Sequence, residues 1–371
     1  MAKLGDICEI LDHKRIPITA SNRTAGPYPY YGANGVQDYV SDYIFDDELV
    51  LLAEDGGYFG SPDKPIAYRV SGKCWVNNHA HVLKPKEGID VDYLCYSLMY
   101  RDVSNIVNGA TRQKLTQADM RNINVPIPSI EVQKEITRKI DKVFSLIFFR
   151  KQQLAKLDEL VKARFVELFG SLNDNDKGLD VVSIEELCTL IKDGTHQTPT
   201  YTEDKKNGFK FLSSKDVMTQ KICWDDIKYI PAELHEKLYA TIQPQRNDIL
   251  MSKNGVNYGV AAVNDTDEIF DIYVSLALLR PRTDMVNPVY LRCVINNLDT
   301  KRQFDSSIKG IGVPNLHLGE IKKTKVLLPP IDKQNEFVAF VEQTDKSKLT
   351  VQQSLDTLEV MKKALMQKCF G

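Results

Sequence analysis

The sequence predicts an α+β protein with an internal duplication. We expect two loop-rich, mixed α/β lobes, separated by two long antiparallel coiled-coil helices and related by pseudo-two-fold symmetry. Two observations lead to this prediction: a repeat that spans about half of the chain, and a long amphipathic segment at the end of each copy. Because 371 residues exceed the size of an ordinary single domain, the chain has enough residues for two cores.

The repeat is clearest near the end of each half. Residues 125–133 (VPIPSIEVQ) align with residues 326–334 (VLLPPIDKQ) at an offset of 201 positions. The offset falls to 180 at the start, where Asp6-Ile7-Cys8 resembles Glu186-Leu187-Cys188, so the second half has the longer loops. The larger offset also relates Gly109, Leu115 and Met120 to Gly310, Leu316 and Ile321, and Phe169-Gly170 to Phe370-Gly371.

The segments that end the two halves have the heptad pattern of long helices. In the first, apolar residues recur in steps of three and four from Ile136 to Leu168, with Arg150 and Arg164 as interruptions. At ~1.5 Å per residue, each helix would be roughly 57 Å long. Such helices need a partner, and antiparallel pairing with each other would place the lobes at opposite ends. The predicted boundaries are 1–128 (first lobe), 129–170 (first helix), 171–179 (linker), 180–329 (second lobe) and 330–371 (second helix).

Within the lobes, short β-prone runs alternate with turn signals. Residues 49–52 and 274–279 are typical of buried strands, and residues 33–35, 54–57 and 253–255 are rich in the glycine and asparagine of turns. This pattern favours a prominent sheet with many loops in each lobe.

Composition excludes several classes of protein. No apolar run is long enough to cross a membrane, and the N-terminus lacks the layout of a signal peptide, so we expect a cytoplasmic protein without a membrane partner. The seven cysteines form no C-x-x-C pair, which argues for reduced thiols rather than a zinc site or disulfides. The net charge of −2 is a point against DNA binding, because phosphate contacts usually come from a basic surface.

Several motifs point to one family. They are residues 109–115 (GATRQKL), 124–128 (NVPIP), 193–199 (DGTHQTP) and 327–334 (LLPPIDKQ). In this order, and together with the duplication, the chain resembles the specificity subunit of Type I restriction–modification systems over essentially its whole length. One departure is that the family's usual Glu-Gln after the proline pair stands here as Val132-Gln133 and Lys333-Gln334. That departure puts the contacts of these residues in question.

The resemblance implies a DNA-binding subunit without catalytic activity. Each lobe would be a target-recognition domain that reads one half of a bipartite site in double-stranded DNA. The helices would set the gap and dock two methyltransferase subunits, and a motor–nuclease subunit can join for cleavage. No cofactor is expected in this chain, since the resemblance implies that S-adenosylmethionine binds the methyltransferase partners.

Two other functions compete with this interpretation. A stand-alone adenine methyltransferase needs an Asn/Asp-Pro-Pro-Tyr/Phe loop, and residues 287–290 (NPVY) lack the second proline and open a predicted helix. Residues 255–259 (GVNYG) have the wrong spacing for a cofactor loop, and the chain has no Walker A motif. A duplicated coiled-coil adaptor that binds only proteins stays open.

Base reading needs donors and acceptors on exposed loops, although tyrosine and asparagine at turns often serve packing instead. Arg112 and Gln113 are the strongest candidates, because arginine suits guanine and glutamine suits adenine. His79 and His81 would share one face of a strand, as structural or DNA-contacting residues rather than metal ligands; no metal site is predicted. The candidate DNA-binding residues are Tyr30, Tyr31, Asn34, Asn77, Asn78, His79, Thr111, Arg112, Gln113 and Lys114 in the first lobe, and Thr195, His196, Gln197, Thr198, Ser214, Lys215, Lys253, Asn254, Asn257, Tyr258 and Lys309 in the second.

Overall fold

The computed structural model describes residues 1–109, 112–308 and 313–371. These form two compact units that share both long helices. The first unit combines Met1–Gln153 with Val351–Gly371, and the second comprises Leu154–Thr350. Thr111 and Lys309, two of the candidate DNA-binding residues, lie outside the described residues.

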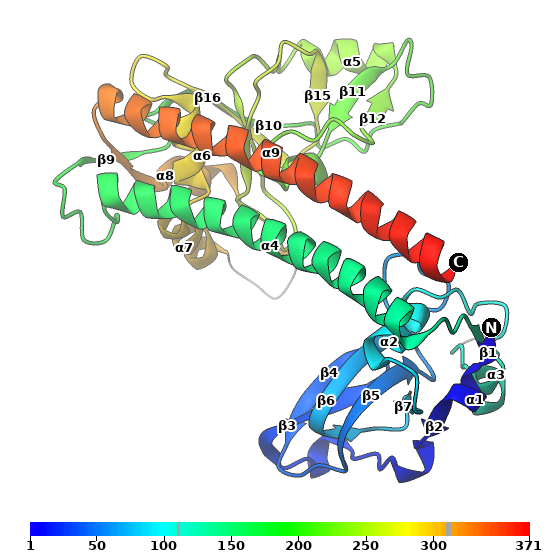
Figure 1. Cartoon of the computed structure of the whole chain (residues 1–371). Helices are drawn as coiled ribbons and strands as arrows, with labels where there is room; N and C mark the ends of the chain where they lie inside the picture. Colours follow the sequence, from blue (N-terminus) through cyan, green and yellow to red (C-terminus); the bar gives the residue numbers. More distant parts are fainter. Residues whose placement is uncertain (110–111, 309–312) are drawn as a thin grey trace. The chain divides into compact units, whose positions relative to one another are not determined.

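The first lobe is built on a six-stranded sheet of order β2-β7-β5-β6-β3-β4 (Figure 1). Its central strand β5 pairs antiparallel with β6 and β7, and the helix α2 (Val91–Met99) packs against β5 and β6. Because β5 is enclosed in this way, Leu49, Val50, Leu51 and Leu52 are fully buried. The strands of the sheet are β2 (Cys8–Ile10), β3 (Ala25–Gly32), β4 (Gly35–Val40), β5 (Phe45–Ala53), β6 (Ala67–Val76) and β7 (Ala80–Pro85). The other elements are β1 (Ala2–Lys3), α1 (Leu4–Ile7), η1 (Asp12–Lys14), η2 (Ala20–Asn22), α3 (Gln117–Arg121) and β8 (Asn124–Val125).

The second lobe divides its strands among three smaller sheets, of orders β10-β16-β13-β14, β12-β11-β15 and β17-β9. The strands are β9 (Asp180–Ser183), β10 (Cys188–Asp193), β11 (Phe209–Leu212), β12 (Lys228–Ile230), β13 (Ile249–Ser252), β14 (Ala261–Val263), β15 (Phe270–Ile272), β16 (Leu276–Pro281) and β17 (Lys325–Leu328). The helices are η3 (Ser214–Val217), α5 (Ala232–Tyr239), α6 (Pro288–Ile295), α7 (Leu298–Ser307) and α8 (Leu318–Lys323).

The duplication is visible in matching contacts. The tyrosine in the first turn of α2, Tyr93, donates its hydroxyl to the carbonyl of Pro126 at 2.9 Å, and Tyr290 of α6 donates to the carbonyl of Leu327 at the same distance. The strand pairs match as well, since β7 lies beside β5 as β16 lies beside β13. The predicted duplicated, mixed α/β fold is therefore confirmed.

The glutamine that follows each proline pair fixes the start of the long helix. Gln133 and Gln334 are fully buried. The Gln133 side chain accepts from the amide of Asp90 at 2.9 Å, and its Nε2 donates to the carbonyls of Gly88 and Pro128. Gln334 makes the same three contacts, with the amide of Asn287 and the carbonyls of Met285 and Pro329. The preceding residue takes no part in these contacts, so the departure at Val132 and Lys333 leaves them intact.

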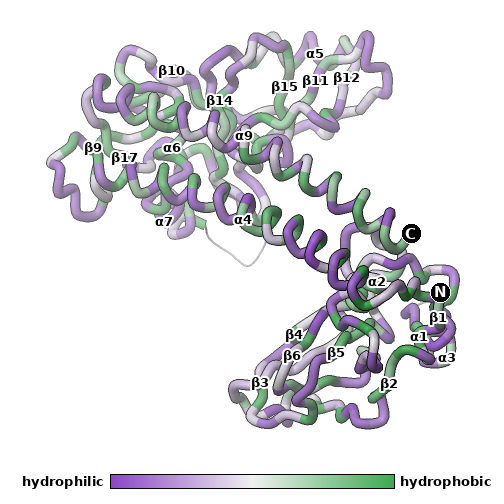
Figure 2. The backbone as a smooth tube through the Cα atoms, in the orientation of Figure 1, coloured by the Kyte–Doolittle hydropathy of each residue, from purple (hydrophilic) through white to green (hydrophobic). Residues whose placement is uncertain are grey.

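The long helices are α4 (Ile130–Phe169) and α9 (Ile331–Phe370), and hydrophobic residues recur along both (Figure 2). In the first unit Arg150 donates to Ser354 and Lys151 pairs with Glu359. In the second unit Asp158 pairs with Lys348, and Arg164 pairs with Glu336. Because positions on α9 fall as those on α4 rise, the helices are antiparallel within each unit. The charged interruptions of the heptad pattern thus serve as pairing residues.

Aromatic residues join the helix ends to the lobes. Phe165 and Phe169 at the end of α4 pack edge-to-face with Phe337 and with each other, and Phe169 also contacts Tyr290. At the end of α9, the repeat-equivalent Phe370 packs against Tyr93, with 5.2 Å between the ring centres. All seven cysteines are free in the structure. Among the described residues, no helix has the length and apolar character needed to span a membrane.

Candidate nucleic-acid interface

One short segment lies at the same place in both lobes. We call residues 112–116 and 313–317 the return segments. The amide of Leu115 donates to the carbonyl of Glu54 at 2.7 Å, directly after β5, and the amide of Leu316 donates to the carbonyl of Lys253 at 2.8 Å, directly after β13. The repeat therefore brings the two return segments to the end of a central buried strand, one in each lobe.

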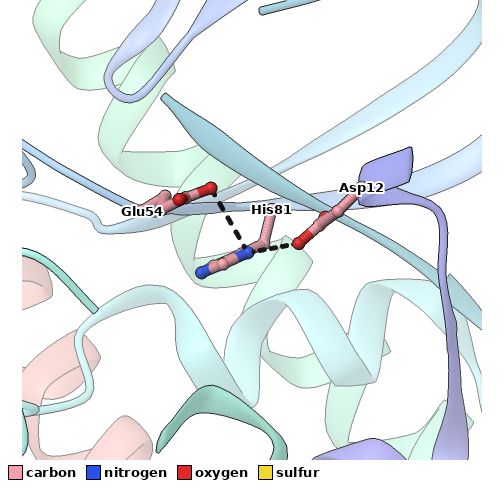
Figure 3. A group of neighbouring side chains, drawn as sticks. All are labelled: Asp12, Glu54 and His81. Atoms are coloured by element: carbon pink, nitrogen blue, oxygen red, sulfur yellow. Dashed lines mark hydrogen bonds and ion pairs between the residues drawn. The ribbon is translucent and has the colours of Figure 1, made fainter. Parts of the chain in front are cut away.

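A buried ion network joins Asp12, Glu54 and His81 (Figure 3). Glu54 and His81 both contact Leu115 of the first return segment. His81 of β7 has its Nδ1 2.6 Å from Oδ2 of Asp12 and its Nε2 2.9 Å from the carbonyl oxygen of Leu115. His81 therefore ties the return segment to Asp12 through its two ring nitrogens.

Arginine and lysine complete the network. Oε2 of Glu54 lies 2.5 Å from Nη1 of Arg15, and Oε1 of Glu54 lies 2.9 Å from Nζ of Lys114. Burial acts to raise the pKa of Glu54, but hydrogen bonds from Arg15 and Lys114 bring that pKa below its usual value. Asp12 behaves alike: burial opposes ionisation, while hydrogen bonds from His81 and Gln117 lower its pKa. Both carboxylates are thus held ionised at neutral pH.

The same group has the donor types that bind metals, since ligand atoms of Asp12, Glu54 and His81 lie within 4.8 Å of one another. However, Arg15 and Lys114 already occupy both oxygens of Glu54, and both ring nitrogens of His81 are engaged. A divalent cation would have to displace these cations. The residues therefore fit an ion network that supports the return segment better than a metal centre.

The second lobe uses a simpler pair at the equivalent place. The buried Lys253 has its Nζ 2.6 Å from Oδ2 of Asp193, and His196 approaches the same oxygen at 3.4 Å. Burial acts to raise the pKa of Asp193, but the contact with Lys253 lowers it below its usual value. The position after the central strand is thus acidic in the first lobe and basic in the second.

Three of the candidate residues, among them Arg112 of the first return segment, meet at the turn after β5. Arg112 donates from Nη2 to Oδ1 of Asp55 at 2.6 Å, and His79 has its Nδ1 2.8 Å from the same oxygen. Asn34 donates to the carbonyl of Gly56 at 3.1 Å. The sequence indicates a turn at residues 54–57, directly after a strand, and that position is the only local signal for Asp55.

The expectation that the candidates stand on exposed loops is wrong for four of them. Four candidates are buried and bond to other residues of their lobe: Tyr30, Asn77, Lys253 and Tyr258. Tyr30 bonds to the backbone of Ile18, Asn77 accepts from the amide of His79, and Tyr258 donates to Asp305. The predicted histidine pair is also wrong in part, because only His81 lies in β7 while His79 lies in the turn before it.

The other described candidates keep some exposure. Tyr31 and Thr195 are partly exposed, as are His79, Ser214 and Asn254. Fully exposed candidates are Asn34, Asn78, Arg112, Gln113 and Lys114 in the first lobe, and His196, Gln197, Thr198, Lys215 and Asn257 in the second. Their contact with DNA stays a prediction.

A repeated lobe with different exposed residues at one place in each copy defines a two-module recognition protein. The chain belongs to the family of the Type I restriction modification DNA specificity domain, whose family model matches residues 1–159 and 176–360. Membership confirms the predicted family and the predicted role in DNA specificity rather than catalysis.

Relatives of known name agree with this assignment. The chain is 27% identical to a putative type I restriction enzyme specificity subunit from Haemophilus influenzae, over 98% of this chain and 94% of the relative. It is 20% identical to the MjaVIII specificity subunit from Methanocaldococcus jannaschii, over 99% of this chain and 90% of the relative.

Among solved structures, the fold is similar to that of the type I S subunit from M. genitalium, with a TM-score of 0.60 and 13% identity over 100% of this chain and 95% of that one. A chain from a structural study of type I R-M complex assembly and conformational transition gives a TM-score of 0.56 at 15% identity, with 100% and 96% covered. These likenesses show a shared fold.

Proposed function

We propose that each lobe reads one half of a bipartite site in double-stranded DNA. The supporting observation is that the two return segments lie at equivalent strand ends but carry different residues, Arg-Gln-Lys at 112–114 and Val-Pro-Asn at 313–315. Base edges are read by side-chain donors and apolar groups, so different residues at one place select different bases. The two half-sites should therefore differ in sequence.

We further propose that the long helices dock two methyltransferase subunits. In the first unit α4 and α9 leave apolar side chains exposed, among them Phe148 and Phe149 at 57% and 60% and Met361 at 51%. In the second unit Leu160 and Leu349 are exposed at 49% and 61%. The repeat relates Phe148 to Leu349 and Leu160 to Met361, so the two apolar patches are equivalent. Equivalent patches suit two copies of one partner.

The catalytic cofactor is proposed to lie outside this chain. S-adenosylmethionine would bind the methyltransferase partners, and a motor–nuclease subunit would join for cleavage. The continuous helices α4 and α9, each shared between the two units, would set the gap between the half-sites.

The test is reconstitution. The chain is co-expressed with its methyltransferase subunit in cells without the nuclease, and methylated adenines are mapped across the genome. We expect one split motif with two unlike halves, and filter binding by the purified complex should prefer that motif over unrelated DNA. A protein-only adaptor would give a complex without any sequence preference, and this result would refute the proposal.

A further inference from the structure

We propose that Arg112 reads a guanine in the half-site of the first lobe, and that Asp55 is the positioning residue that holds its guanidinium group. The inference rests on the proposed function, because it names one base for a lobe already proposed to read DNA. It is carried by the geometry around the turn after β5.

Arg112 is an exposed side chain that pairs with a largely covered carboxylate, that of Asp55. Its side chain is 59% exposed, whereas that of Asp55 is only 16% exposed. Asp55 accepts one N–H from Nη2, and the Nε and Nη1 groups of Arg112 donate to no residue that the structure describes. Since His79 directs its Nδ1 at the same carboxylate oxygen, that oxygen is fixed from two sides. The free donors of the guanidinium are thus available to a ligand.

The backbone next to the guanidinium leaves room for it. Gly56 has a φ of +64°, which disfavours any larger residue, and a Cβ placed there would lie 3.5 Å from both Nε and Nη2 of Arg112. The guanidinium therefore lies against the Gly56 backbone. Asn34, in the turn between β3 and β4, donates a hydrogen bond to the Gly56 carbonyl and so holds the same stretch of backbone. This support fixes the position of Arg112 before DNA arrives, which favours specific contact.

The donors of Arg112 determine which ligand it can bind. In the major groove guanine presents two adjacent acceptors, N7 and O6, whereas adenine presents an acceptor beside an amino donor. A group that has only donors therefore matches guanine and meets a donor at adenine. A phosphate is a poorer match, because the Asp55 carboxylate cancels the charge of Arg112 locally. The site thus suits a base edge better than the DNA backbone.

The second lobe offers a matched control. The repeat places Val313 at the position of Arg112, and this valine is 79% exposed. A valine has no side-chain donor, so it can contact only an apolar group such as the thymine methyl. A change at Val313 should therefore affect the second half-site and leave the first unchanged.

The experiment maps methylation by complexes of the full chain with its methyltransferase subunits. Arg112→Ala should make one guanine position of the first half-site degenerate, with discrimination reduced roughly 5- to 150-fold, and should leave the second half-site intact. Arg112→Lys keeps the charge but lacks the planar guanidinium that donates to two acceptors at once, so it should give the same loss. Asp55→Asn should lower discrimination at that same position. Val313→Ala is the control, and thermal melts verify that each complex is folded.

Three results would overturn the inference. One is an unchanged first half-site in Arg112→Ala. Another is that Arg112→Ala lowers the affinity equally for every DNA sequence and that Arg112→Lys restores it, since this result indicates a phosphate contact. The last is a change in both half-sites from Arg112→Ala alone. If the unaltered complex yields no split motif at all, the proposed function itself fails, which is a separate outcome.

Discussion

Glu54 and Lys253 occupy equivalent positions after the central strands of the two lobes, yet they carry opposite charges. Each accepts, through its backbone carbonyl, the amide of a leucine in the return segment, and each buries its side chain in an ion pair. Glu54 is matched by Arg15 and Lys114, and Lys253 is matched by Asp193. The residue that supports the return segment thus has the same place in both lobes, but its side chain is negative in the first lobe and positive in the second.

Removing one partner of such a pair should destabilise the lobe. We predict that Lys253→Met lowers the free energy of unfolding by about 3 kcal/mol, because it leaves the Asp193 carboxylate without its cation. The double variant Lys253→Met with Asp193→Asn should recover most of this loss. Denaturant unfolding measures both, and equal midpoints for the single and double variants would contradict the prediction.

Acid should weaken the first lobe. The pKa values of Asp12 and Glu54 are lowered on folding from ordinary values of 3.8 and 4.5. A lowered folded pKa gives stability that is present above the ordinary value and is lost as pH falls through the folded value. The free energy of unfolding should therefore decline as pH drops below about 4.5. Chemical unfolding from pH 7 to 3 tests this, and Asp12→Asn should show a shallower decline if the network is its source.

The buried glutamines should matter equally in both lobes. Gln133→Ala leaves the amide of Asp90 and the carbonyls of Gly88 and Pro128 without their partner, for a cost of about 3 kcal/mol. Gln334→Ala should cost a similar amount. The control is Val132→Ala, where the side chain is 42% exposed and the effect should stay within about 0.5 kcal/mol. Thermal unfolding of the three variants decides whether the glutamine is structural.

The apolar patch on the helices should govern assembly. We predict that replacing Phe148 and Phe149 with serine weakens binding of the methyltransferase subunit by roughly 30-fold, about 2 kcal/mol, without loss of stability. Val36→Ser on β4 is a control at a site of similar exposure, 46%. Calorimetry with the purified subunit gives both affinities. Equal affinity for the double variant and the control would rule out this patch as the docking surface.

The helices should also determine the gap in the recognised site. Because polar pairs join α4 to α9 within each unit, a lengthening must be made in both helices. Four residues inserted after Gln152 and four after Thr350 add about one turn, or ~6 Å, to each helix. The unread gap should grow by one or two base pairs while both half-sites stay the same. Methylation mapping tests this, and an active variant with an unaltered gap would refute it.

Features that depend on neighbours in sequence could be predicted. The Asn34-Gly35 turn, the buried run in β5 and the helix that follows Asn287 all come from local signals. The antiparallel helices followed from their heptads and from the direction of the chain. The strand predicted from Val274 starts only at Leu276, because Val274 donates its amide to Thr195 before the strand pairing begins.

Features that join distant residues could not be predicted. Asp12 and His81 lie 69 positions apart, and nothing near either residue indicates the other. The burial of Lys253 depends on Asp193, from a strand 60 positions earlier. A lysine beside a glycine turn has the pattern of an exposed DNA contact, so the wrong expectation arose from a partner that only the fold supplies.

The aromatic contact between Tyr93 and Phe370 has a consequence for synthesis on the ribosome. A chain emerges from its N-terminus, and lobes made early usually fold early. Here the first compact unit includes residues 351–371, where Lys363 also pairs with Asp63. The part of the protein translated first is therefore completed last. The first unit lacks its segment of α9 while the entire second lobe is made. Premature termination near residue 350 would therefore leave the first unit incomplete, although most of it is synthesised first.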